Sequence, residues 1–105
     1  MKFLILVSLF SISANAAITR NYAEVKNTLQ RLATQYAANV ALIDIGVSDS
    51  GEPIKGLKIG NGPVKNLVVA THHGNEYGST EVALGFAEAL SNNPILGQTV
   101  FVIPV

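Results

Sequence analysis

The stretch that decides the fold is Lys65-Asn66-Leu67-Val68-Val69-Ala70-Thr71-His72-His73-Gly74-Asn75-Glu76-Tyr77-Gly78. Its first six residues are mostly apolar or β-branched and predict a strand, and we expect residues 67–70 to be buried on both faces. The eight residues that follow contain two glycines and show no periodicity, which indicates a loop. In open α/β sheets, ligands gather beyond the carboxyl ends of parallel strands, so this loop occupies the place where a site is expected.

A helix and a further strand follow the loop. The helix is predicted from about Ser79 to the Asn-Asn-Pro stretch at residues 92–94, because apolar residues recur there every four positions: Val82, Phe86 and Leu90. Residues 99–103 are again apolar and β-branched, and they predict another strand. Strand, loop, helix and strand form a βαβ crossover, so the two strands are expected to be parallel.

The segment before this unit predicts a helix and a pair of strands. One helical face is formed by residues spaced three and four apart: Tyr22, Val25, Leu29, Leu32 and Tyr36. Asn21 is expected to cap this helix, with Glu24 as its capping partner. Residues 40–45 and 54–59 are short and apolar, and the brief connection between them favours an antiparallel pair.

The predicted fold class is therefore α/β with a mixed sheet: a helix, an antiparallel strand pair, and a strand-loop-helix-strand crossover. Two helices cover only part of four strands, which leaves a wide apolar surface without a partner. We therefore expect residues 17–105 to be the N-terminal portion of a larger α/β domain. A complete minimal domain is the alternative that size leaves open.

The N-terminus has the features of a signal peptide. Lys2 is a positive start, Phe3 to Ile12 is an apolar run, and Ala14-Asn15-Ala16 fits the small-residue cleavage pattern. The apolar run is too short for a transmembrane helix, which needs about 20 residues. We therefore expect residues 1–16 to be removed on export to the periplasm or the cell exterior, with no membrane span left after cleavage.

The composition excludes several classes of protein. Seven basic and seven acidic side chains give a net charge of zero, which excludes the strongly basic surface of a nucleic-acid-binding protein. The absence of cysteine excludes a disulfide scaffold, a thiolate zinc finger and a cysteine nucleophile. His72 and His73 are the only histidines, so any site that uses imidazole must include this dipeptide.

The loop contains a candidate metal site, His73-Gly74-Asn75-Glu76, which is an H-x-x-E motif. Imidazole nitrogen and carboxylate oxygen are both good zinc ligands, and two intervening residues let them converge on one ion. The position between a strand end and a helix favours metal binding. The spacing alone leaves open that both side chains bond to backbone or water. In an extended chain the side chains of His72 and His73 point in opposite directions. His72 is therefore expected to face solvent or to contact the metal ligands without binding the metal itself.

Other motifs fit known sites less well. Residues 60–62 (GNG) begin like a dinucleotide loop, but the third glycine and the following helix are missing. Residues 74–80 (GNEYGST) are one residue short of a phosphate loop and lack its lysine. The chain also has no G-x-S-x-G motif of the serine hydrolases.

With these residues assembled, the sequence resembles the zinc carboxypeptidase family, of the carboxypeptidase A type. The resemblance covers essentially all of residues 17–105. It is carried by five segments: Tyr22-Ala23-Glu24-Val25, Ile45-Gly46-Val47-Ser48, Gly51-Glu52-Pro53-Ile54, Leu57-Lys58-Ile59-Gly60, and the apolar strand that leads into His73-Gly74-Asn75-Glu76.

The resemblance implies roles for three residues of the loop. His73 and Glu76 match the first two ligands of a catalytic Zn²⁺. Asn75 stands where animal digestive members usually have a substrate-site arginine, so it is the substrate-binding candidate. The family's third ligand (a later histidine), its carboxylate-binding arginines and its catalytic glutamate all lie beyond residue 105, so no catalytic residue is assigned within this fragment.

The resemblance also implies an activity. A water activated by zinc, with a glutamate as general base, would attack the last peptide bond of a substrate. Export fits two substrate classes, which are peptides with a free C-terminus and the peptidoglycan stem peptides of bacterial cell walls. We expect a metallocarboxypeptidase fragment that is inactive alone. The alternatives are an exported binding module without hydrolysis and a truncated product on the same scaffold.

We predict that the exported protein begins at Ala17, because cleavage follows the small-residue pattern at residues 14–16. N-terminal sequencing of the exported fraction measures the first residue directly. An intact Met1 in that fraction would show that the segment is not a cleaved leader.

Overall fold

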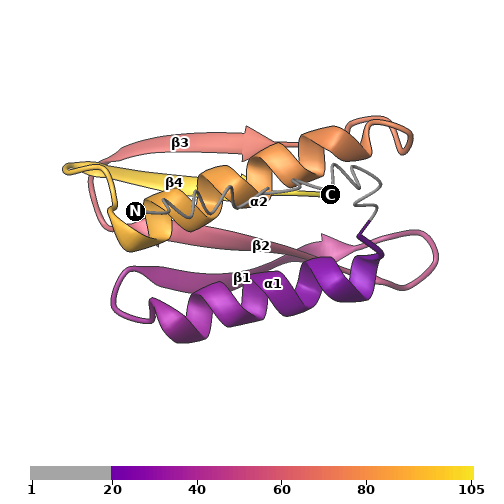
Figure 1. Ribbon diagram of the computed structural model, residues 1–105, viewed down its shortest axis with the longest axis horizontal. Coiled ribbons are helices and arrows are strands. Elements are labelled where there is room, and N and C mark those ends of the chain that lie inside the picture. The colour runs from indigo at the N-terminus through magenta and orange to yellow at the C-terminus, as the bar shows by residue number, and fades with distance from the viewer. Residues whose placement is uncertain (1–19) are drawn as a thin grey trace, which may run out of the picture.

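The computed structural model describes residues 20–105, so the expected signal peptide at residues 1–16 lies outside the described residues. The elements are α1 (Tyr22–Gln35), β1 (Val40–Val47), β2 (Pro53–Gly60), β3 (Val64–Val69), α2 (Tyr77–Asn92) and β4 (Gln98–Ile103). Within this range, α1 and α2 lie side by side over one face of a mixed sheet (Figure 1). The predicted α/β class is confirmed. Neither of these helices is long and apolar enough to cross a bilayer.

The sheet formed by residues 20–105 has the strand order β1-β2-β4-β3. β1 pairs antiparallel with β2, and β3 pairs parallel with β4, as the sequence predicts. β4 also pairs antiparallel with β2, so the last strand of the chain lies between β2 and β3. This insertion places β3 at the edge of the sheet.

α1 begins at the capping box that the sequence predicts. The Asn21 side chain accepts a hydrogen bond from the Glu24 N–H at 2.9 Å, and the Glu24 carboxylate accepts one from the Asn21 N–H at 3.3 Å. Each bond satisfies an amide that the first helical turn leaves without a partner. Loss of such a cap typically costs about 1 kcal/mol. The helix then turns Val25, Leu29 and Leu32 into the core.

The hydrophobic core lies between the sheet and the two helices. Its largest fully buried apolar side chains come from α1, β2 and β4 and include Leu29, Leu32, Leu57, Ile59 and Val102. The register places Leu57 opposite Val102, so their side chains lie on the same face of the sheet. Burial of a side chain of this size contributes about 1.5–3 kcal/mol to stability.

The buried face of α2 includes only one of the three apolar residues whose spacing predicted the helix, Leu90. The helix begins at Tyr77 rather than near Ser79, and its buried residues are Thr80, Ala83, Leu84, Ala87, Leu90 and Ser91. Val82 is 74% exposed, and Phe86 is also exposed. Small side chains at Ala83 and Ala87 let the helix approach the sheet closely. The buried face therefore contains these two alanines. The larger Val82 and Phe86 are thereby turned outward.

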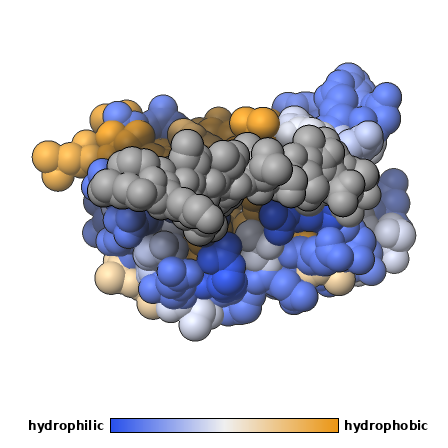
Figure 2. Space-filling model, viewed as in Figure 1, coloured by the Kyte–Doolittle hydropathy of each residue, from blue (hydrophilic) through white to orange (hydrophobic). Residues whose placement is uncertain are grey.

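The expectation that residues 67–70 are buried on both faces is wrong for β3 in this structure. Leu67 is 63% exposed and Val69 is also exposed, while Val68 is half-buried and Ala70 is buried. The reason is that β3 is an edge strand and that the described helices cover only one face of the sheet. Figure 2 shows hydrophobic surface along the side of the molecule where β3 lies.

We predict that Leu57→Ala lowers the free energy of unfolding by about 2–5 kcal/mol, because it removes a fully buried side chain and leaves a cavity. The matched change Leu96→Ala should alter it by less than about 0.5 kcal/mol, since Leu96 is 98% exposed. Urea unfolding followed by circular dichroism measures both values. Equal costs at the two sites would contradict the assignment of the core.

Candidate metal centre

The candidate site lies on the loop that joins β3 to α2, at the carboxyl ends of the parallel strands β3 and β4. The Ala70 N–H donates to the Ile103 carbonyl at 2.9 Å, so the parallel ladder extends one residue past β3. The Glu76 N–H then donates to the His73 carbonyl at 2.9 Å and closes a tight turn. The loop that carries the H-x-x-E motif is therefore held by the end of the sheet on one side and by this turn on the other.

The structure brings His73 and Glu76 together. The His73 Nδ1 atom lies 2.8 Å from the Glu76 Oε1 atom, and the side chains are 76% and 51% exposed. Glu76 is the N-cap residue of α2, but its side chain makes no capping hydrogen bond. Its carboxylate is therefore free of the helix backbone and faces the imidazole.

This pair fits the first half of a zinc site. Zinc takes imidazole nitrogen and carboxylate oxygen at about 2.0–2.2 Å, and a catalytic site needs three protein ligands and one open position. His73 and Glu76 offer two such donors at one point of an accessible loop. Among residues 20–105, no group of three or more His, Cys, Asp or Glu side chains could hold a metal ion. A third ligand would have to come from outside this range.

The two neighbours of the pair do not join it. His72 and Asn75 are both exposed, like the rest of residues 72–78, whereas Thr71 is half-buried. The exposed position of His72 agrees with the expectation that it faces solvent. Asn75 lies between His73 and Glu76 in the chain, and its side chain is exposed to solvent.

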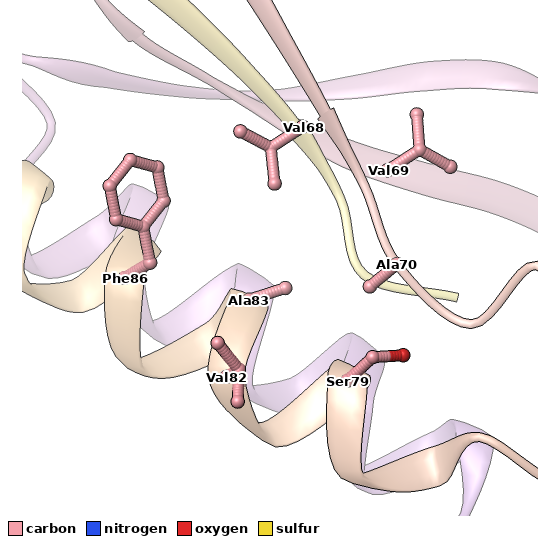
Figure 3. Close-up of a pocket in the computed structure, with 7 residues that line it drawn as sticks. All are labelled: Val68, Val69, Ala70, Ser79, Val82, Ala83 and Phe86. Carbon is pink, nitrogen blue, oxygen red and sulfur yellow. The ribbon is translucent and has the colours of Figure 1, made fainter.

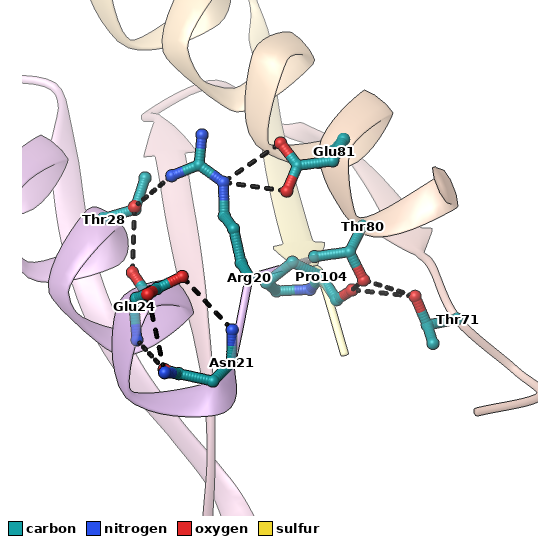
Figure 4. Close-up of polar contacts among 8 residues, drawn as sticks. All are labelled: Arg20, Asn21, Glu24, Thr28, Thr71, Thr80, Glu81 and Pro104. Atoms are coloured by element: carbon teal, nitrogen blue, oxygen red, sulfur yellow. Dashed lines mark hydrogen bonds and ion pairs between the residues drawn. The ribbon is translucent and has the colours of Figure 1, made fainter. Parts of the chain in front are cut away.

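Sequence reasoning missed a cluster of three hydroxyl groups beside the loop, two of which, Thr71 and Thr80, are shown in Figure 4. Thr71 Oγ1 contacts Thr80 Oγ1 and lies 3.1 Å from Ser79 Oγ, and Thr80 donates to the Pro104 carbonyl at 2.8 Å. The only signal in the sequence was the Ser79-Thr80 pair at the start of the second helix. Its relation to Thr71 depends on the fold of the loop, which local sequence does not reveal.

A small hollow of about 130 Å³ lies beside the loop, between the first turns of α1 and α2. On its wall, Arg20 Nε lies 2.8 and 3.0 Å from the two carboxylate oxygens of Glu81 (Figure 4). Arg20 also donates to Thr28 Oγ1 at 3.1 Å. The pair links the segment before α1 to the first turns of α2, and as a partly exposed ion pair it contributes about 0–1 kcal/mol to stability.

A family model described as zinc carboxypeptidase matches residues 25–100, which include the whole loop and most of the sheet. The chain belongs to the zinc carboxypeptidase family. The match begins within α1 and ends within β4, so it includes at least part of every element of the described fold. No curated protein matches the chain significantly by sequence.

Solved carboxypeptidase-like structures share the fold. Bovine thrombin-activatable fibrinolysis inhibitor, solved in complex with tick carboxypeptidase inhibitor, matches 82% of this chain with a TM-score of 0.75 and 19% identity. Another structure of thrombin-activatable fibrinolysis inhibitor matches 79% with a TM-score of 0.71 and 19% identity. Carboxypeptidase A from Helicoverpa armigera matches 82% with a TM-score of 0.64 and 24% identity. The aligned part is 30%, 24% and 24% of these chains, so the present chain spans less than a third of each.

Proposed function

We propose that this chain is the N-terminal portion, at residues 17–105, of an exported zinc-dependent carboxypeptidase. The observation that carries the proposal is the His73–Glu76 pair, which lies within the family match at the carboxyl ends of β3 and β4. Its substrates would be peptides with a free C-terminus or peptidoglycan stem peptides. Three features together support peptide hydrolysis over peptide binding without hydrolysis: the ligand pair, its place on an accessible loop, and the family match.

The chain's own residues would hold the metal and present the loop to substrate. His73 would bind through a neutral imidazole nitrogen and Glu76 through its ionised carboxylate. Bound zinc supplies Lewis acidity that polarises a peptide carbonyl and activates water as a nucleophile. Asn75, exposed between the two ligands, would contact the substrate through its side-chain amide. The general base and a third ligand would come from further protein.

An uncovered apolar surface supports the view that more protein packs on this unit. A hollow of about 440 Å³ lies between β3 and α2, and its lining is almost wholly apolar: Val68, Val69, Ala70, Ser79, Val82, Ala83 and Phe86 (Figure 3). Val82 and Leu67 are also exposed, Val82 beside this hollow on α2 and Leu67 on β3. Further polypeptide beyond β3 would cover the hollow and Val82, whereas cover for Leu67 would come from protein on the sheet face that the two helices leave open.

We predict that His73→Ala in the full natural protein abolishes zinc-dependent peptide hydrolysis and removes bound zinc, because a three-ligand site loses an imidazole that nothing replaces. The adjacent change His72→Ala is the matched control and should cost much less. Metal content by atomic absorption and release of C-terminal residues from a peptide panel measure the two effects. Equal losses in both variants would contradict the assignment of His73 over His72.

We also predict that residues 17–105 alone do not catalyse peptide hydrolysis. This piece supplies two ligands and no positioned general base, and metal affinity falls when the site is not preformed. The test adds zinc to the purified segment and measures C-terminal release. Chelator-sensitive turnover near the rate of the full natural protein would show that the site is self-contained. A full natural protein that binds peptides without cleaving them would favour the binding-module alternative.

A further inference from the structure

We infer that Thr71, Ser79 and Thr80, here called the hydroxyl cluster, position the loop that carries His73 and Glu76 for metal binding. The inference rests on the proposed function. It assigns to three residues outside the H-x-x-E motif the task of holding the two ligands in place before metal arrives.

The backbone at Thr71 gives the first reason. Thr71 has a φ of +52°, and it is the one non-glycine residue among residues 20–105 with a positive φ. A β-branched side chain rarely adopts this conformation, so the surroundings must hold it there. The conformation occurs at the first residue after the strand ladder, where it sets the direction in which the loop leaves the sheet.

The hydrogen bonds of the hydroxyl cluster hold Thr71 in this conformation. The Thr71 N–H donates to Ser79 Oγ at 2.8 Å, and Thr80 Oγ1 donates to the Pro104 carbonyl at 2.8 Å. Each hydroxyl has one proton to donate. With the Thr80 proton on Pro104, the contact between Thr71 and Thr80 is made by the Thr71 proton. Thr80 and Pro104 are buried, so this end of the cluster is anchored to the segment that follows β4.

Ser79 connects the cluster to the ligands. Its Oγ accepts the Thr71 N–H and donates to the Glu76 carbonyl at 2.7 Å. The Glu76 N–H in turn donates to the His73 carbonyl at 2.9 Å. One hydroxyl therefore bonds to backbone on both sides of the loop, so a shift of Thr71 would be passed to Glu76 and His73.

The test separates the hydroxyl groups from the backbone conformation. In the full natural protein, Thr71→Val keeps the side-chain shape and removes the hydroxyl, whereas Thr71→Ser keeps the hydroxyl. Thr71→Gly relieves the cost of the positive φ and also removes the hydroxyl. Ser79→Ala removes the bridge to Glu76. Thr34→Val makes the same change as Thr71→Val on the exposed face of α1, and is the matched control.

Metal-free protein is titrated with Zn²⁺, and with Co²⁺ as a spectroscopic probe whose visible absorption reports the ligand geometry. We expect Thr71→Val, Thr71→Gly and Ser79→Ala to weaken zinc binding about tenfold or more and to alter the cobalt spectrum. Thr71→Ser and Thr34→Val should stay within about twofold of the unmodified protein. Hydrogen exchange of the amides of residues 72–76, measured without metal, should speed up in the first three variants only.

Two results would overturn the inference, and they are distinguishable. If His73→Ala loses zinc while Thr71→Val and Ser79→Ala bind it as tightly as the unmodified protein, the proposed metal site stands and the positioning role falls. If the unmodified protein and His73→Ala bind zinc equally, the proposed function itself is wrong and the positioning role falls with it. Circular dichroism of each variant shows whether it is folded, and Ser79→Ala serves as the second probe if Thr71→Val is not.

Discussion

The pairing of β4 on both of its edges holds the two halves of the structure together. On one edge it bonds antiparallel to β2, and on the other it bonds parallel to β3. Its inward residues Val100 and Val102 are buried between the sheet and the helices. The α1–β1–β2 unit and the β3–α2 crossover therefore share one strand as their common partner. The candidate site depends on the same strand, because Ile103 and Pro104 accept the hydrogen bonds that fix the two ends of the loop.

Local patterns predicted the elements well and their arrangement less well. The capping box at Asn21, the apolar face of α1 and the antiparallel strand pair depend on residues close in sequence, and the structure confirms all three. The position of β4 between β2 and β3 depends on contacts between distant segments, which no local pattern encodes. The periodicity that predicted α2 did not show which of its faces is buried, for a related reason. Leu90 is buried, but Val82 and Phe86 are exposed because close packing on the sheet favours the small alanines next to them.

The same division applies to the candidate site. His73 and Glu76 are three residues apart, so a tight turn is enough to bring their side chains together, and the motif predicted this proximity. The hydroxyl cluster could not be predicted in this way. It needs a left-handed backbone at Thr71, and it needs Pro104, which accepts a hydrogen bond from the Thr80 hydroxyl and is distant in sequence from the loop. Sequence spacing thus predicted which two side chains meet, while only the tertiary fold revealed the hydroxyl contacts beside them.

The exposed edge of β3 has a consequence for how copies of the chain meet one another. An edge strand offers unpaired N–H and C=O groups to any other strand, and apolar segments of this kind seed intermolecular β-structure. Lys65 is the one charged residue in β3, and a lysine on an edge strand opposes such pairing. Leu67, Val68 and Val69 have no such protection. The free edge of β3 is therefore open to pairing with the same strand of a second copy of the chain.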